Sequence, residues 1–214
     1  MPARIDPASL PKFPGLVFEN SLWKQGLTKL GGVDEAGRGS WAGPVTAAVV
    51  ILPAAGSIKK RLRGVRDSKQ MTSIQREKWA LTIQEICPSW SVGFASAAEI
   101  DEIGIIPATR LAVQRALEKL SCVPDHLLMD YLLLPDIAIP QTSLIKGDRR
   151  SLSIAAASVL AKSCRDAHMR RLDEDLPGYD FGQHKGYGTQ RHREAIRKMG
   201  LCPIHRKSYK FQRN

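Results

Sequence analysis

Short apolar segments of strand length recur in this sequence, and acidic residues stand where they stop. Aliphatic and β-branched residues favour strands in these segments, because such side chains pack well on a pleated surface. The segments and their acids are residues 30–35 with Asp34 and Glu35, residues 126–130 with Asp130, and residues 142–146 followed after one glycine by Asp148. We therefore expect a sheet whose strand ends carry carboxylates.

Further strands and several helices fit around these segments. Residues 43–52 form a predicted strand, joined to residues 30–35 by a glycine-rich turn, and residues 90–96 form another. Apolar residues at helical spacing predict two helices, an Ala-rich stretch without Gly or Pro predicts a third, and a stretch that Gly200 ends predicts a fourth. They cover residues 74–86, 108–120 with Pro107 in the first turn, 151–171 and 190–198. This order of elements favours a mixed α/β sheet with helices packed on it.

The length of 214 residues and the apolar fraction of 43% indicate one folded domain rather than a disordered chain. Residues 1–28 contain four prolines and are expected to form an irregular N-terminal lead-in with a short helix over 18–25, and residues 29–214 form the domain. No apolar run is long enough to span a membrane and no secretory signal is seen, so we expect a cytoplasmic protein without membrane contact. The four cysteines are scattered, which favours reduced thiols.

Positive charge is concentrated in two places. The formal net charge is +11, and residues 184–214 contribute +8 of it through nine basic residues and one acid. A second basic run covers residues 59–69, where Asp67 is the only acid. Two such clusters indicate a polyanionic partner, because neutralising phosphates releases condensed counterions. A basic surface that serves solubility alone is the alternative.

The strand-end acids point to a divalent metal ion. Converging carboxylates repel one another and lose hydration, and a hard cation such as Mg²⁺ or Mn²⁺ offsets both costs through oxygen ligands. The alternative for any single acid is a turn or helix-cap role. Neighbours on a regular strand point to opposite faces, so Asp34 and Glu35 serve one site only if the strand bends or bulges, or if one contributes its backbone carbonyl.

Two glycine-containing loops are further candidates for ligand contact. In Gly37-Arg38-Gly39 the glycines let the backbone approach a ligand closely, and Arg38 adds a permanent charge beside the first two acids. Glycines on both sides of Tyr187 could expose that ring for stacking on a sugar or base. A plain hairpin turn and a buried tyrosine are the alternatives, and neither loop has the spacing of a nucleotide-binding motif.

Six motifs follow one another along the chain: Gly32-Val33-Asp34-Glu35-Ala36-Gly37-Arg38-Gly39 with Ala42-Gly43-Pro44-Val45, Asp67-Ser68-Lys69-Gln70, Met129-Asp130, Lys146-Gly147-Asp148, IAAASVLAK over residues 154–162, and His184-Lys185-Gly186-Tyr187. In order and spacing they resemble the ribonuclease HII family over residues 30–208. The resemblance implies a ribonuclease H-like fold, in which a mixed sheet is flanked by helices and a basic C-terminal helical part over residues 176–214 helps to grip a duplex. It also implies an endonuclease that hydrolyses RNA in RNA–DNA hybrids and acts on ribonucleotides embedded in duplex DNA, and we expect it to be a monomer.

The resemblance also assigns a catalytic centre. The family's four metal-site acids match Asp34, Glu35, Asp130 and Asp148. Two divalent ions, Mn²⁺ or Mg²⁺, would clamp the scissile phosphate, one activating a water and the other stabilising the leaving 3′-oxygen. Cleavage in this family falls 5′ of the ribonucleotide and leaves a 3′-hydroxyl and a 5′-phosphate.

Substrate contacts follow from the same resemblance. The segment that senses the 2′-hydroxyl matches Gly37, Arg38 and Gly39, and Tyr187 matches the residue that stacks on the following sugar. Phosphate contacts are expected from Ser151 and Ser158, and from four lysines: Lys69, Lys146, Lys162 and Lys185.

One position departs from the family pattern. Glycine often follows the third acid in the family, whereas this chain has Tyr131 there. We expect the ring to point into the core and to leave Asp130 free.

The remaining titratable residues are interpreted as structural or as surface charge. Asp166 and residues 173–175 are expected to be helix-surface charge, and His126 and His168 to be structural. His184 and His205 either reach a phosphate or lie at a solvated surface.

Two other functions stay open on the sequence alone. A non-catalytic nucleic-acid binder would explain the basic clusters, but its four acids would repel phosphate without a metal. Another nuclease on the same fold, such as a ribonuclease HIII, is the second; residues 1–28 are shorter than the extra N-terminal domain that ribonuclease HIII usually carries.

Overall fold

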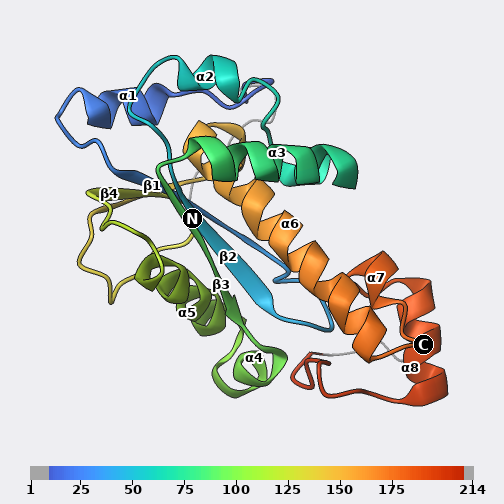
Figure 1. Ribbon diagram of the computed structural model, residues 1–214. Helices are drawn as coiled ribbons and strands as arrows, with labels where there is room; N and C mark the ends of the chain where they lie inside the picture. The colour runs from blue at the N-terminus through green and yellow to red at the C-terminus, as the bar shows by residue number, and fades with distance from the viewer. Residues whose placement is uncertain (1–9, 210–214) are drawn as a thin grey trace.

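The computed structural model describes residues 10–209. One five-stranded sheet in the order β3-β2-β1-β4-β5 forms its centre, with helices on both faces (Figure 1). The strands are β1 (Leu30–Ala36), β2 (Val45–Ile51), β3 (Ser89–Ala95), β4 (His126–Asp130) and β5 (Gln141–Leu144). The mixed α/β sheet flanked by helices that the sequence predicts is confirmed.

The pairing of the strands brings distant acids together. β2 runs antiparallel to β1 and β3, whereas β1, β4 and β5 pair in parallel. The ladder between β1 and β4 runs from Leu30 opposite His126 to Val33 opposite Met129. Asp34 and Asp130 are the next residues of this register, on strands whose usual separation is about 4.8 Å.

Helices cover both faces of the sheet. α6 (Leu152–Asp175) and α3 (Ser73–Ile86) lie on one face, where Ala48 and Val50 of β2 join the alanines of α6 in a buried core. α5 (Ile105–Glu118) covers the other face and packs on Ala47 and Val49. Every residue of β2 is buried because helices stand on both sides of it.

Local capping chemistry sets several helix starts. Thr72 caps α3 and Ser96 caps α4 (Ala97–Ile103), each in a reciprocal capping box. The sequence pattern does not predict α4, although the Ser96-x-x-Glu99 capping signature is present. Nor does it predict α2 (Ile58–Arg61), a single turn that is too short for an apolar period. α6 extends four residues beyond the predicted end at residue 171.

The N-terminal segment is packed against the start of α6. The short helix expected near residue 18 is present as α1 (Val17–Trp23). Its Glu19 is fully buried and accepts hydrogen bonds from Ser151 Oγ (2.6 Å) and Ser153 Oγ (2.8 Å), which join α1 to the start of α6. Residues 10–16 have no helix or strand, as expected for the lead-in, and residues 1–9 lie outside the described range.

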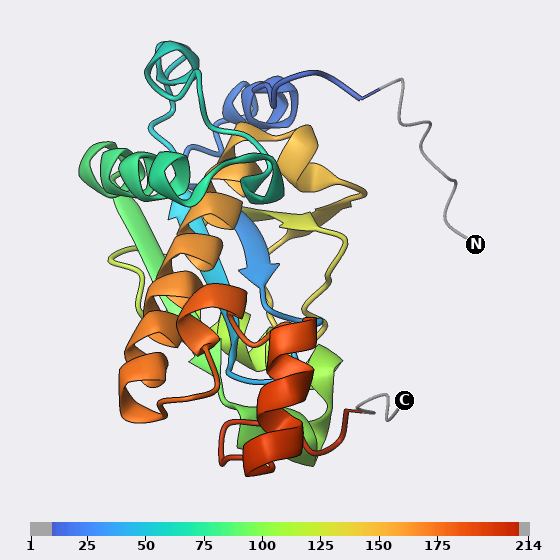
Figure 2. The same cartoon turned by 90° about the vertical axis from the view of Figure 1, so that its right-hand side faces the viewer.

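The C-terminal part gathers at the far end of α6 (Figure 2). It contains α7 (Phe181–His184) and α8 (Gln190–Met199), and its small core joins Phe181 and Cys202 to Met169 of α6 and to Ala42, which follows β1. Two basic residues counted in this part, Lys210 and Arg213, lie outside the described range. Within residues 10–209 no helix combines the length and apolar character needed to cross a bilayer, and the four cysteines are free thiols.

Candidate active site

Asp34 is buried, as is Asp148, and it lies among like charges. Burial raises the pKa of Asp34 well above its usual value, and the charges of Glu35, Asp130 and Asp148 raise it further. A hydrogen bond from Ser158 acts in the opposite direction. The four acids that the sequence places at strand ends are thus close enough to influence one another.

Glu35 follows Asp34 without a break in the strand. The pairing of β1 with β2 continues through Asp34 opposite Ala48 and Glu35 opposite Ala47, so no bulge turns both side chains to one face. Arg38 Nη1 binds Glu35 Oε1 at 3.2 Å instead. Burial raises the pKa of Glu35, and Arg38 reduces that rise.

The other two acids are held at the end of the parallel strands. Asp130 Oδ1 accepts a hydrogen bond from the backbone of Gly147 (2.8 Å), next to Asp148 in a short 3₁₀ turn. Burial, followed by the charges of Asp130 and Asp67, raises the pKa of Asp148 to about 6. Asp67 also lies near this site, although the sequence does not assign it there; its place as the only acid in the basic run over residues 59–69 is the available signal.

Lys69 is the cation that faces the acid group. Burial alone would lower the pKa of Lys69, yet the pKa is raised because Asp34, Asp67, Asp148 and Asp130 lie nearby. The backbone of Lys69 donates to the carboxylate of Asp67 (2.9 Å), which fixes the turn in front of the acids.

The donor set suits a hard divalent cation. Four carboxylates with raised pKa values supply only oxygen ligands, and a metal ion would reverse the cost of their ionisation. Within residues 10–209 no three acidic, histidine or cysteine side chains are already arranged as a closed ligand set. Protein donors hold their oxygens: the backbone of Glu35 on Asp34, Arg38 on Glu35, and the backbone of Gly147 on Asp130.

Two buried arginines fix the loop between β1 and β2. Arg206 is fully buried and donates to the carbonyls of Gly37 (2.7 Å), Arg38 (2.8 Å) and Gly43 (3.0 Å). Arg165 of α6 binds the carbonyls that precede and follow Gly43. Gly37 has φ +93°, and a Cβ there would lie 2.0 Å from Arg165 Nε, so glycine is required. Arg206 is one of the nine basic residues counted over residues 184–214, but it is buried and binds main-chain carbonyls.

Tyr187 lies in a tight loop beside α6. Its ring is 37% exposed, so it is not the buried tyrosine considered as the alternative, and it covers Lys162 Nζ at 5.3 Å. Lys162 also forms an ion pair with Asp166 (2.7 Å), and Lys185 turns back to the carbonyl of Gly182. Both lysines are therefore engaged within the protein.

Of the other residues expected to contact phosphate, two are exposed and two are buried. Lys69 and Lys146 are exposed. Ser158 is buried, donates to Ser68 Oγ (2.9 Å) and lies beside Asp34. Ser151 is fully buried and caps α6 while it binds Glu19, so its hydroxyl is used inside the fold.

Tyr131 does not point into the core. Its side chain is 59% exposed, so the expectation of a buried ring is wrong. Its backbone has φ 60°, a left-handed conformation that costs a bulky L-residue roughly 1–2 kcal/mol and glycine almost nothing. This conformation explains physically why glycine suits the position.

Several titratable residues are buried rather than exposed. Asp166 is 5% exposed and binds both Arg76 (3.1 Å) and Lys162, so its assignment as surface charge is wrong. His184 and His205 are buried as well, which excludes the solvated position considered for them.

The buried histidines of the C-terminal part form a hydrogen-bonded chain. The backbone N–H of Cys202 donates to His205 Nδ1 (2.9 Å), so the proton of His205 lies on Nε2, which faces His192 Nε2 at 3.0 Å. His192 Nδ1 then donates to the carbonyl of Tyr187 (3.0 Å). The chain links the end of the molecule to the Tyr187 loop, and each ring takes part in its neutral form.

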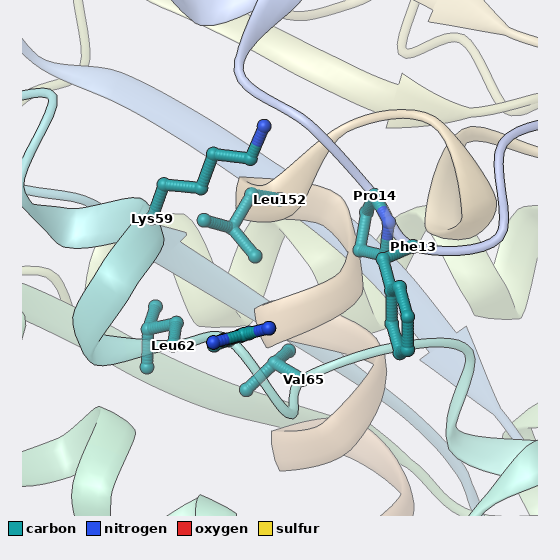
Figure 3. Close-up of a pocket in the computed structure, with 7 residues that line it drawn as sticks. Phe13, Pro14, Lys59, Leu62, Val65 and Leu152 are labelled. Atoms are coloured by element: carbon teal, nitrogen blue, oxygen red, sulfur yellow. The ribbon is translucent and has the colours of Figure 1, made fainter.

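A pocket of about 270 Å³ lies elsewhere, between the N-terminal segment, α2 and the first turn of α6 (Figure 3). It contains none of the four acids, and its lining consists of Phe13, Pro14, Lys59, Leu62, Arg63, Val65 and Leu152.

Comparison with known proteins decides the family. The family model described as Ribonuclease HII matches residues 31–212. The chain belongs to the ribonuclease HII family. Ribonuclease HII of Dehalococcoides mccartyi (strain 195) is 47% identical over 201 residues, 92% of each chain. That of Synechococcus sp. (strain JA-3-3Ab) is 50% identical over 196 residues, 92% of this chain and 88% of the relative.

Solved structures agree with this assignment. Ribonuclease H2 from Pyrococcus horikoshii OT3 superposes with a TM-score of 0.69 at 27% identity and covers 85% of this chain and 94% of its own. RNase HII from Archaeoglobus fulgidus, solved as a complex with PCNA, gives 0.70 at 27% identity over 87% and 97% of the two chains. This member of the ribonuclease HII family is a ribonuclease H type enzyme.

Proposed function

We propose that this ribonuclease HII hydrolyses the RNA strand of RNA–DNA hybrids and cuts 5′ of single ribonucleotides in duplex DNA, leaving a 3′-hydroxyl and a 5′-phosphate. The observation that carries the proposal is the register of the parallel strands β1 and β4, which places Asp34 beside Asp130, together with the bond from the Gly147 N–H to Asp130 Oδ1 (2.8 Å), which brings Asp148 to the same place. These acids come from separate segments, and no capping role explains why the fold brings their charges together.

The four acids are the residues that would hold two divalent ions, Mg²⁺ or Mn²⁺. Because no bulge interrupts β1 at Glu35, this residue would contribute through its backbone carbonyl. Bound there, the ions would neutralise the scissile phosphate and lower the pKa of an attacking water. A protein with the same fold, Bst-RNase HIII, was solved in complex with Mn²⁺; it is 21% identical to this chain, with a TM-score of 0.60. Lys69 adds a fixed positive charge on the same side of the acids.

Substrate selection is assigned to two loops. Gly37, Arg38 and Gly39 would sense the 2′-hydroxyl, because Arg206 presents this backbone in one fixed conformation. Tyr187 would stack on the following sugar, supported by the cations beneath its ring. Lys146 is exposed beside Asp148 and is suited to a phosphate. We assign the enzyme to the cytoplasm as a monomer, in keeping with its free thiols.

The test is cleavage of a labelled DNA duplex that contains one ribonucleotide, with Mg²⁺, with Mn²⁺ and without divalent ions. We expect one cut 5′ of the ribonucleotide, a 3′-hydroxyl on the upstream product, and no cut without metal. An all-DNA duplex is the matched control. A cut on the other side of the ribonucleotide, or tight binding without cleavage, would contradict the proposal.

A further inference from the structure

Tyr131 combines three properties that are rare together. It directly follows Asp130, its backbone has φ 60°, and its side chain is 59% exposed. A left-handed conformation is a genuine outlier for a bulky residue and is typically retained where it serves a site.

The hydrogen bonds around Tyr131 impose this backbone. Its N–H donates to the carbonyl of Leu144 (3.1 Å) on β5, and the N–H of Leu132 donates to the carbonyl of Asp130 (2.7 Å). Both bonds involve only main-chain atoms. Glycine at this position would make them without strain, so the backbone does not explain the ring.

Packing within the protein does not explain the ring either. In the described part of the chain no residue forms a hydrogen bond with the Tyr131 hydroxyl, and no aromatic or cationic side chain lies against its face. More than half of the side chain is in contact with solvent. The free protein therefore keeps a strained, exposed aromatic residue whose side chain contributes little to its stability.

The position of Tyr131 indicates what its ring meets. Asp130 Oδ1 is fixed by Gly147, so the residue after it stands at the edge of the acid group where the scissile phosphate is proposed to bind. The nucleotides on either side of that phosphate carry sugar and base faces. Aromatic rings stack on such faces with little regard to sequence.

We propose that Tyr131 is a substrate-binding residue whose ring packs against a sugar or base of the nucleic-acid strand next to the scissile phosphate. This inference rests on the proposed function. It adds an aromatic contact on the β4 side of the acid group, separate from that of Tyr187 in the C-terminal part.

Substitutions separate the ring from the backbone strain. Tyr131→Gly removes both, Tyr131→Asn removes the ring but tolerates the left-handed backbone, and Tyr131→Phe keeps the ring. Leu133→Ala is the matched control, because Leu133 is 51% exposed in the same loop. Dissociation constants for a single-ribonucleotide duplex are measured in an Asp34→Asn background, and KM, kcat and Tm in the otherwise native enzyme.

We expect Tyr131→Gly and Tyr131→Asn to weaken binding and raise KM about tenfold, with kcat within twofold, while Tyr131→Phe and Leu133→Ala stay near native. Tyr131→Gly is also expected to raise Tm, since it relieves the strained backbone. Unchanged binding in Tyr131→Gly, or an equal loss in Leu133→Ala, would overturn the inference. Failure of the native enzyme to cut any duplex would instead refute the proposed function, and the binding comparison would still judge Tyr131.

Discussion

At the scale of single residues, Asp34 shows how the site is poised for a cation. Its pKa is raised by burial and then by the neighbouring acids, so its ionised form is costly without metal. An acid whose pKa is higher in the folded than in the unfolded state lowers the free energy of unfolding as the pH rises above the unfolded pKa, about 3.9. A bound divalent ion would lower the pKa of Asp34 and restore stability at neutral pH.

Asp34→Asn therefore has opposite effects on stability and activity. We expect a higher Tm than the native enzyme in metal-free buffer at pH 8, and kcat lower by about a thousandfold with metal. The rise of Tm on adding Mn²⁺ should shrink in the variant. The exposed Glu102→Gln serves as control, and an unchanged Mn²⁺ response in Asp34→Asn would show that the ion binds elsewhere.

Arg206 provides a second test at this scale. Arg206→Lys cannot reach all three carbonyls that the guanidinium binds, so buried acceptors lose their donors. We expect a loss of about 2–4 kcal/mol in the free energy of unfolding, measured by urea denaturation. Lys207→Gln, at an exposed neighbour, should change it by less than about 0.5 kcal/mol. Equal stability of the two variants would contradict the bracing role.

Sequence reasoning located the acids but not the residues that hold them. Strand-end carboxylates are visible because they interrupt apolar segments. In the sequence, Arg165 and Arg206 cannot be told from arginines at the surface. Only the fold shows that each is buried against carbonyls of the loop after β1. The left-handed backbone at Tyr131 was likewise hidden, because a residue type does not disclose its φ.

At the scale of elements, the chain of histidines couples α8, the Tyr187 loop and the C-terminal segment. Burial is the main cause that lowers the pKa of His192 to about 4, followed by the charge of His184. The unfolded value is about 6.5, so the unfolded chain binds more protons between these pH values. Stability is therefore lost as the pH falls from about 6.5 towards 4, the reverse of the effect of the acids.

The lowered pKa of His192 predicts that the C-terminal part loses stability in acid. Between pH 7 and pH 5, hydrogen exchange at α8 and the Tyr187 loop should accelerate more than at the strands of the sheet. His192→Asn keeps a donor towards the Tyr187 carbonyl but does not titrate, so its Tm should fall less over the same interval. Parallel pH profiles for the native protein and the variant would contradict the role of His192.

Periodicity identified most elements because packing and pattern agree in them. β1 to β4, α3, α5 and α8 lie within a few residues of their predicted positions. β5 begins and ends earlier than predicted, since Lys146 adopts a left-handed turn before the 3₁₀ helix. α2 and α4 are not predicted, for different reasons. α2 is too short to show a periodic pattern, and the sequence signal of α4 is its N-cap rather than an apolar face.

At the scale of the whole molecule, the acids lie in a fold with basic surface at both ends. α2 stands at one end and α8 at the other, with α6 extending between them (Figure 1). Lys59, Lys60 and Arg61 on α2 are exposed, and none of them forms an ion pair with a described acid. A nucleic acid across the site could meet cations on both sides.

Salt dependence of binding measures these interactions. Replacing Lys59, Lys60 and Arg61 by Gln should weaken duplex binding and reduce the slope of log Kd against log salt by about one unit for each phosphate that is no longer neutralised. A matched pair on the opposite end is Lys198→Gln with Lys207→Gln, both exposed. An unchanged slope for either set would remove that end from the binding surface.

The architecture follows from the sequence more fully than the assembly of the site does. The alternation of predicted strands and helices is enough to predict a mixed sheet flanked by helices. Strand order and register, in contrast, depend on contacts between residues far apart in the sequence. The pairing of β1 with β4 joins residues about 96 positions apart, and no local pattern encodes it.

The grip of Arg206 on residues 37–43 also affects how the enzyme is made. During synthesis the loop proposed to inspect the ribose leaves the ribosome early, but the guanidinium that braces it arrives some 163 residues later. Until residue 206 has been made, a nascent chain lacks this brace, and the loop is not held in the conformation proposed to inspect the ribose.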